Sequence, residues 1–139
     1  PGNKCDKNIF FDWFVELRDE FYMYTLFIGY DPWHIDDTLL RQFKAEFGQN
    51  SMIPVRQGAL TCSQPLKNLA ADFKAHRIVY DNNPVMKWNL INAEIKADVN
   101  NNIQLVHAAD RRRRSDGASA LMDAYKVLMD KRDSFINMN

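Results

Sequence analysis

Asp31 stands where an α/β protein could place catalytic chemistry. It directly follows the apolar, aromatic run of residues 24–30 and precedes Pro32, which cannot continue a strand ladder. The run predicts a buried strand, so the Asp31 carboxylate would lie at the carboxyl end of a strand, where open α/β sheets bind their ligands. On spacing alone, a turn acid that bonds nearby backbone amides is the more common alternative. His34, three residues further on, could serve as a ligand or as an acid/base group.

Asp116 is the second candidate acid. It follows Ser115, the predicted N-cap of the last helix, so it would lie in the first turn of that helix. The helix dipole and the neighbouring arginines favour an ionised carboxylate, which is the hard oxygen ligand that a divalent cation requires. Most acids in first turns only complement the dipole, and this is the alternative interpretation. Two fixed carboxylates beside a cationic segment indicate metal-assisted work on a phosphodiester.

The densest charge run of the chain consists of Arg111, Arg112, Arg113 and Arg114. Guanidinium forks suit phosphate oxygens, and such a run beside a metal site could hold a DNA strand. A solvated loop, with the arginines paired to Asp110 and other acids, is an equally good interpretation.

The elements that must position these side chains alternate between helices and strands. Strands alternating with helices predict an α/β fold with parallel pairing, and the last two strands predict a β-hairpin near 93–106. The predicted order is a helix after Asp6 that reaches Phe21, a strand at 24–30, a helix from Asp36 or Asp37 to Gly48, a strand at 52–55, a helix capped by Ser63, an extended piece at 77–80, a helical turn at 83–88, strands at 93–99 and 103–106, and a helix from Ser115.

Composition excludes several classes of protein. In 139 residues, 46% hydrophobic and 12% aromatic side chains exclude a disordered chain and fit one domain. Eighteen basic and eighteen acidic side chains cancel, so any contact with nucleic acid must come from a local patch. Cys5 and Cys62 are far apart, which favours reduced thiols in a cytosolic setting. No apolar stretch approaches the roughly 20 residues that span a bilayer, and no phosphate-loop motif predicts an ATP site in this segment.

Four short motifs occur in an order that resembles the C-terminal nuclease domain of terminase large subunits from tailed phages or prophages. The resemblance covers nearly the whole chain, and the ordered set is more specific than any of its parts. The motifs are Gly29-Tyr30-Asp31-Pro32-Trp33, Val55-Arg56-Gln57-Gly58, Asn83-Pro84-Val85-Met86-Lys87-Trp88 with Asn92, and Arg114-Ser115-Asp116-Gly117 with Ala120-Leu121.

The resemblance implies a ribonuclease H-like α/β fold, truncated at the N-terminus because the opening strands are missing. Residues 1–139 would then form a single nuclease-domain fragment, the C-terminal part of a terminase large subunit. The implied activity is a Mg²⁺- or Mn²⁺-dependent endonuclease that cuts concatemeric DNA for the packaging motor by two-metal hydrolysis. Asp31 and Asp116 match two of the metal-binding carboxylates of the family. A third is expected upstream, so the fragment alone is expected to cut poorly or not at all.

The resemblance also implies partners. These are double-stranded DNA, the portal and the small terminase subunit in the host bacterial cytoplasm, with no membrane. Missing strands would leave exposed sheet edges, which favour self-association. His34, Asp110 and His107 are possible accessory residues; at the position of His107, family members often carry a lysine. The alternative functions are a resolvase-like nuclease of the same fold and a non-catalytic docking fragment of the motor.

Overall fold

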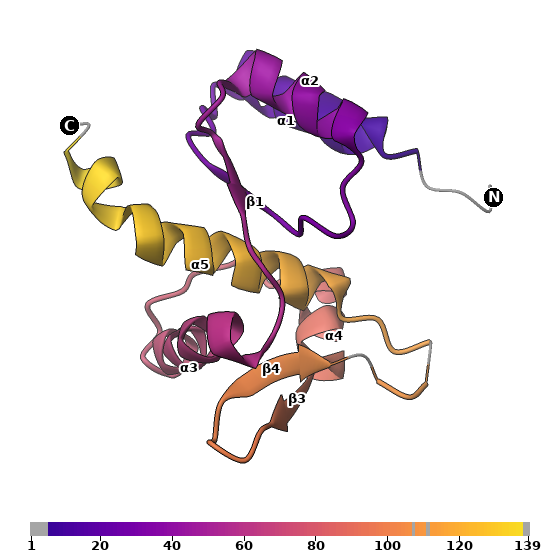
Figure 1. The fold of residues 1–139 in the computed structure, drawn as a ribbon, viewed down its shortest axis with the longest axis vertical. Helices are drawn as coiled ribbons and strands as arrows, with labels where there is room; N and C mark the ends of the chain where they lie inside the picture. The colour runs from indigo at the N-terminus through magenta and orange to yellow at the C-terminus, as the bar shows by residue number, and fades with distance from the viewer. Residues whose placement is uncertain (1–5, 107, 111, 138–139) are drawn as a thin grey trace. The chain divides into compact units, whose positions relative to one another are not determined.

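The computed structural model describes residues 6–106, 108–110 and 112–137 (Figure 1). The chain divides into two compact units, Pro1–Pro54 and Val55–Asn139, and each is described by itself. Both units combine helices with a small two-stranded sheet, so the predicted α/β class is confirmed at this level. Within the described residues, no helix combines the length and the apolar character needed to cross a bilayer.

The first unit pairs two helices with a short parallel sheet. Asp36 caps the second helix as predicted, because its carboxylate accepts the Leu39 N–H at 2.8 Å. The helices lie side by side (Figure 1). The ring of Phe11 on the first helix packs edge-on against the ring of Phe43 on the second, with the ring centroids 5.3 Å apart. Leu39, Phe43 and Met52 form the buried core. The elements are α1 (Asn8–Asp19), β1 (Ile28–Tyr30), α2 (Asp37–Phe47) and β2 (Met52–Pro54).

The strand predicted at residues 24–30 is much shorter in the structure. Only Ile28–Tyr30 forms β1, which pairs in parallel with Met52–Pro54 of β2. A strand is defined by its partner, and β2 offers three residues that end at Pro54, which has no N–H to extend the ladder. The apolar run therefore predicted the end of the strand but not its length, and the parallel pairing predicted from the alternation of helices and strands is confirmed.

The second unit packs three helices and a hairpin around one core. Cys62, Leu66 and Met122 are buried together, with Ile103 and Leu105 packed against them. The hairpin predicted near 93–106 is confirmed, since its two strands pair in antiparallel register from Glu94–Val106 to Ala97–Ile103. The elements are α3 (Ala59–Lys74), α4 (Pro84–Asn92), β3 (Glu94–Ala97), β4 (Ile103–Val106) and α5 (Asp116–Ile136).

The predicted cap of α3 is wrong. The helix begins four residues before Ser63, after Gly58, whose φ of 131° is a backbone conformation that favours glycine. Ser63 is buried inside the helix, where its hydroxyl accepts the Ile103 N–H at 3.1 Å and so joins α3 to β4. The helical turn predicted at 83–88 continues to Asn92. The piece predicted to be extended at 77–80 forms no strand.

Tyr125→Phe is expected to lower the free energy of unfolding by about 1 kcal/mol, the usual contribution of one hydrogen bond. The Tyr125 hydroxyl on α5 donates to the Asp72 carboxylate on α3 at 2.5 Å, joining the two helices. This bond, together with partial burial, raises the pKa of Tyr125. A group with a raised folded-state pKa stabilises fully below its unfolded value, about 10 for tyrosine, and loses that contribution as pH rises.

The measurement is urea unfolding of the protein and of Tyr125→Phe, at pH 7 and above pH 10. The difference between the two proteins should shrink at alkaline pH, because the tyrosine contribution is then being lost. A difference that stays constant with pH would contradict the assignment.

Candidate metal and DNA-binding site

Asp31 lies immediately after β1, as the sequence predicts, and both of its carboxylate oxygens are engaged. Oδ1 accepts the Trp33 N–H at 2.9 Å, the local turn bond of the alternative interpretation. Oδ2 lies 2.6 Å from Nδ1 of His34. The Asp31 side chain is 20% exposed, whereas that of His34 is 84% exposed. Because an ionised carboxylate only accepts, the proton of a neutral His34 ring belongs on Nδ1, which leaves Nε2 as an acceptor facing solvent.

Asp116 is the first residue of α5 and is exposed, with no side-chain partner within the described part of the chain. The predicted cap, Ser115, is buried but makes no side-chain bond to the helix. Instead Asn89 of α4 accepts the Gly117 N–H at 2.9 Å, while its Nδ2 donates to the Val85 carbonyl at 3.0 Å. The turn that carries Asp116 is therefore fixed by a buried side chain from α4.

Gly117 explains how α4 can approach so closely. A Cβ at this position would lie 3.1 Å from Cγ of Asn89, tighter than ordinary van der Waals contact. The asparagine side chain thus occupies the space that any other residue at 117 would need. The Arg114-Ser115-Asp116-Gly117 motif therefore places its acid beside a glycine that admits the cap.

Asn89→Ala is expected to destabilise the protein by about 1–2 kcal/mol, since it removes a helix cap and leaves the Gly117 N–H without its acceptor. Ser115→Ala is the matched control, and a smaller loss is expected because the serine makes no capping bond. Chemical denaturation monitored by circular dichroism measures both. A larger loss for Ser115→Ala than for Asn89→Ala would restore the serine as the cap.

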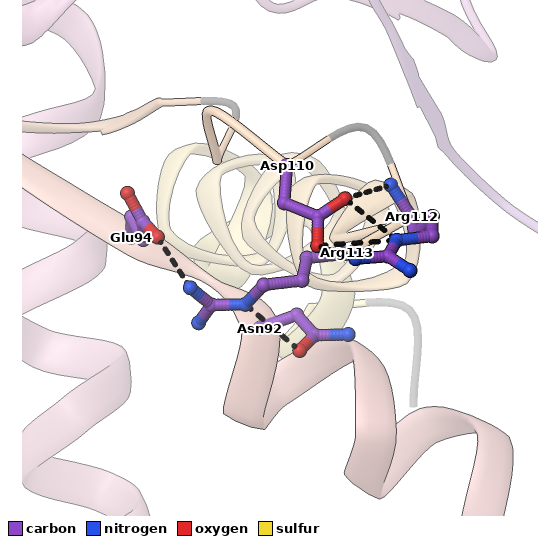
Figure 2. Close-up of polar contacts among 5 residues, drawn as sticks. All are labelled: Asn92, Glu94, Asp110, Arg112 and Arg113. Atoms are coloured by element: carbon purple, nitrogen blue, oxygen red, sulfur yellow. Dashed lines mark hydrogen bonds and ion pairs between the residues drawn. The ribbon is translucent and has the colours of Figure 1, made fainter.

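The arginine run is partly paired with acids, as the alternative interpretation predicted (Figure 2). Arg112 forms a fork on Asp110, with Nε 3.1 Å from Oδ1 and Nη2 3.0 Å from Oδ2. This guanidinium contact lowers the pKa of the Asp110 carboxyl. Arg113 reaches Glu94 at the start of β3 at 2.9 Å and the Oδ1 of Asn92 at 3.4 Å.

Arg114 is exposed and has no side-chain partner in the described segments, so its guanidinium is available to an anion. Arg111 and His107 lie outside the described residues. The Arg112 pair is itself exposed at the surface, where an ion pair contributes little to stability. An anion could therefore replace Asp110 as the partner of Arg112 at little energetic cost.

The described residues contain no group of three or more His, Cys, Asp or Glu side chains that could hold a metal ion. Asp31 belongs to the first unit and Asp116 to the second, and each acid is described in its own surroundings. The chemistry of Asp31 and Asp116 fits a divalent cation, because both side chains are carboxylates. Asp116 is also exposed and has no competing side-chain partner among the described residues.

Sequence reasoning missed the polar residues that organise the start of α5. Asn89 and Asn92 sit on one face of α4 and are buried, although asparagine is a poor residue inside helices. Asn92 binds Arg113 through Oδ1, and its Nδ2 is buried with no hydrogen-bond partner in the part described. Two asparagines at i and i+3, in a helix whose other residues apart from Lys87 are apolar, are the signal that could have indicated them.

The first unit has a carboxylate at the end of a strand, and the second has one at the start of a helix that directly follows an arginine run. These are residue types that nucleases use. Residues 18–131 match the family described as "Terminase large subunit, endonuclease domain". The chain belongs to this family, and the matched segment includes both Asp31 and Asp116. Comparison with curated proteins gave no significant match, and neither did comparison with solved structures.

Proposed function

We propose that this protein is the metal-dependent DNA endonuclease of a phage or prophage packaging motor, cutting concatemeric DNA into genome units. The observation that carries the proposal is the family match, which runs through both candidate acids. The exposure of Asp116 and the place of Asp31 at the end of β1 support it. We further propose that residues 1–139 form one nuclease domain and that its fold is ribonuclease H-like.

Asp31 and Asp116 would hold two divalent cations, Mg²⁺ or Mn²⁺, with water and DNA phosphate oxygens filling the remaining positions. When bound, the cations would supply activation of a water and stabilisation of the leaving oxygen. Asp31 binds Nδ1 of the His34 ring, so Nε2 of the same ring would be the atom that accepts a proton. Asn89 holds the first turn of α5, which fixes the backbone from which the Asp116 side chain extends.

The arginine run would grip the DNA backbone without reading its sequence. Arg114 would bind a phosphate directly, whereas Arg112 would exchange Asp110 for a phosphate. Arg111 is proposed to take part in the same binding. Cleavage would therefore be independent of local sequence unless a partner supplies specificity.

As a packaging nuclease, the protein would work in the host bacterial cytoplasm on double-stranded DNA, together with a portal and a small terminase subunit. Self-association is also proposed, because α1 exposes a large apolar surface. No residue of α1 is buried in its unit, and Ile9, Phe10 and Trp13 are all more than half exposed. Exposed apolar surface of this kind commonly marks contact sites.

The test is incubation of the purified protein with supercoiled plasmid in Mg²⁺, in Mn²⁺ and in EDTA. Slow formation of nicked or linear product with either cation, and none in EDTA, is expected, because residues 1–139 are expected to cut poorly by themselves. Cleavage that persists in EDTA would contradict metal dependence. No cleavage with either cation, by these residues or by a longer protein that adds a third carboxylate, would favour the docking function, which the local bonding of both Asp31 oxygens also supports.

Asp110→Asn is expected to strengthen DNA binding, because it removes the acid that competes with phosphate for Arg112. Arg114→Gln should weaken DNA binding. It should also lower the slope of log Kd against log[salt] by about 0.9, the value for one phosphate contact. Fluorescence anisotropy of a labelled duplex at two salt concentrations measures both. Asp12→Asn, which makes the same charge change on α1, is the control and should leave affinity nearly unchanged. Equal gains in Asp110→Asn and Asp12→Asn would mean that only net charge matters.

A further inference from the structure

A cavity of about 650 Å³ lies between α3 and α5, within the second unit. From α5, Tyr125, Leu128, Met129 and Arg132 line it at spacings of three, four and seven, the positions that share one face of a helix. Tyr125 is nine residues beyond Asp116, about 13 Å along the helix axis. The cavity is therefore separate from Asp116.

One wall of the cavity is a polar network with a fixed geometry. The Asp72 carboxylate accepts the Tyr125 hydroxyl and is 2.9 Å from Nε of Arg77. The end of α3 positions that arginine: His76 has a φ of 54°, and the Arg77 N–H then returns to the Asp72 carbonyl at 2.9 Å. Such a helix ending orders the residue that follows it.

The cavity carries an excess of positive charge. Arg77 and Arg132 both line it and both act electrostatically on the Tyr125 hydroxyl, whereas Asp72 is the single acid in the lining. The Arg77 side chain is 68% exposed, and a guanidinium has five N–H donors, which one carboxylate does not exhaust. Arg132 is exposed and forms no ion pair with another described residue. A second carboxylate would complete this network.

The rest of the lining is Asn68, whose Nδ2 donates to Sδ of Met129, and three apolar residues. Leu128 is half exposed, and Met129 and Ala71 lie beside it in the cavity wall. An occupant of this cavity must therefore present an anion to the arginines and a hydrophobic group to these side chains.

We propose that this cavity binds an acidic peptide segment of a partner protein, with a glutamate or aspartate between Arg77 and Arg132 and a neighbouring apolar side chain against Leu128 and Met129. Duplex DNA fits less well. Its phosphates lie on a convex surface and follow one another closely, so Asp72 would repel them and the apolar wall would gain nothing. A single side chain can enter a concave site, as peptide anchors do.

The test uses the whole protein, labelled with ¹⁵N, and two probes: acetyl-Gly-Leu-Glu-Glu-Leu-Gly-amide and the same peptide with both glutamates replaced by glutamine. The acidic peptide should shift the amide resonances of Ala71, Leu128 and Met129. Arg132→Gln should weaken this binding by about tenfold, because it removes one charge-assisted pair. Arg41→Gln, an exposed substitution on α2, should leave it unchanged.

Three outcomes would overturn the proposal. The first is no shift at millimolar acidic peptide. The second is an equal shift with the glutamine peptide, which would indicate apolar contact alone. The third is a larger shift with inorganic phosphate or a short duplex, which would make the cavity a phosphate or nucleic-acid site. Since the peptides contain no phosphodiester, their failure to bind leaves the endonuclease proposal untouched.

Discussion

Replacing Asp31 or Asp116 by asparagine should reduce the rate of DNA cleavage by more than about 100-fold, since loss of a direct ligand should exceed the 10–100-fold typical of an outer-shell partner. Asparagine removes the charge that a divalent cation requires but keeps the shape of the side chain. In Asp31→Asn the amide oxygen can still accept the Trp33 N–H, so the turn after β1 should survive. Plasmid cleavage in Mg²⁺ and Mn²⁺ measures the effect, and circular dichroism checks folding.

Asp37→Asn is the matched control for Asp116→Asn. Asp37 is also an exposed acid in the first position of a helix, α2, but it lies outside the proposed site. If Asp116 only complements the dipole of α5, both substitutions should have the same small effect on stability and none on cleavage. Wild-type rates in both Asp31→Asn and Asp116→Asn would refute the metal assignment.

Met122→Ala should lower the free energy of unfolding by about 3 kcal/mol, within the range for large-to-small changes in a core. Met122 on α5 is completely buried and packs with Cys62 and Leu66 of α3, and the hairpin residues Ile103 and Leu105 close the same cluster. A cavity here would loosen α5 from α3 and from the hairpin. Urea denaturation provides the measurement.

Met122→Leu is the comparison, because it nearly conserves volume and should cost less than about 1.5 kcal/mol. If alanine and leucine proved equally mild, the cluster around Met122 would not be the core of the second unit. If the two were equally severe, the flexibility of methionine, rather than its volume, would be the property that matters.

The parts of the fold that depend on local chemistry were predictable from the sequence. Asp36 and Gly48 bound α2 because capping needs only residues within one turn. The hairpin turn was predictable because Asp98 accepts the N–H groups of Asn100 and Asn102. The length of β1 was not, since it depends on how many residues of β2 are available for pairing.

The candidate site divides in the same way. The contact between Asp31 and His34 follows from a short turn, and the pairing of Arg112 with Asp110 follows from adjacency. The bond from Arg113 to Glu94 depends on where the hairpin begins relative to the arginine loop. The cap from Asn89 depends on how α4 approaches α5, which periodicity does not encode.

The asparagine bond from α4 has one more consequence. The turn that carries Asp116 is held by a side chain of α4, a helix more than twenty residues earlier in the chain, rather than by the neighbouring Ser115. A substitution in α4 is therefore expected to lower the proposed nuclease activity although every charged side chain is still present. A mutational survey restricted to acidic residues would overlook this effect.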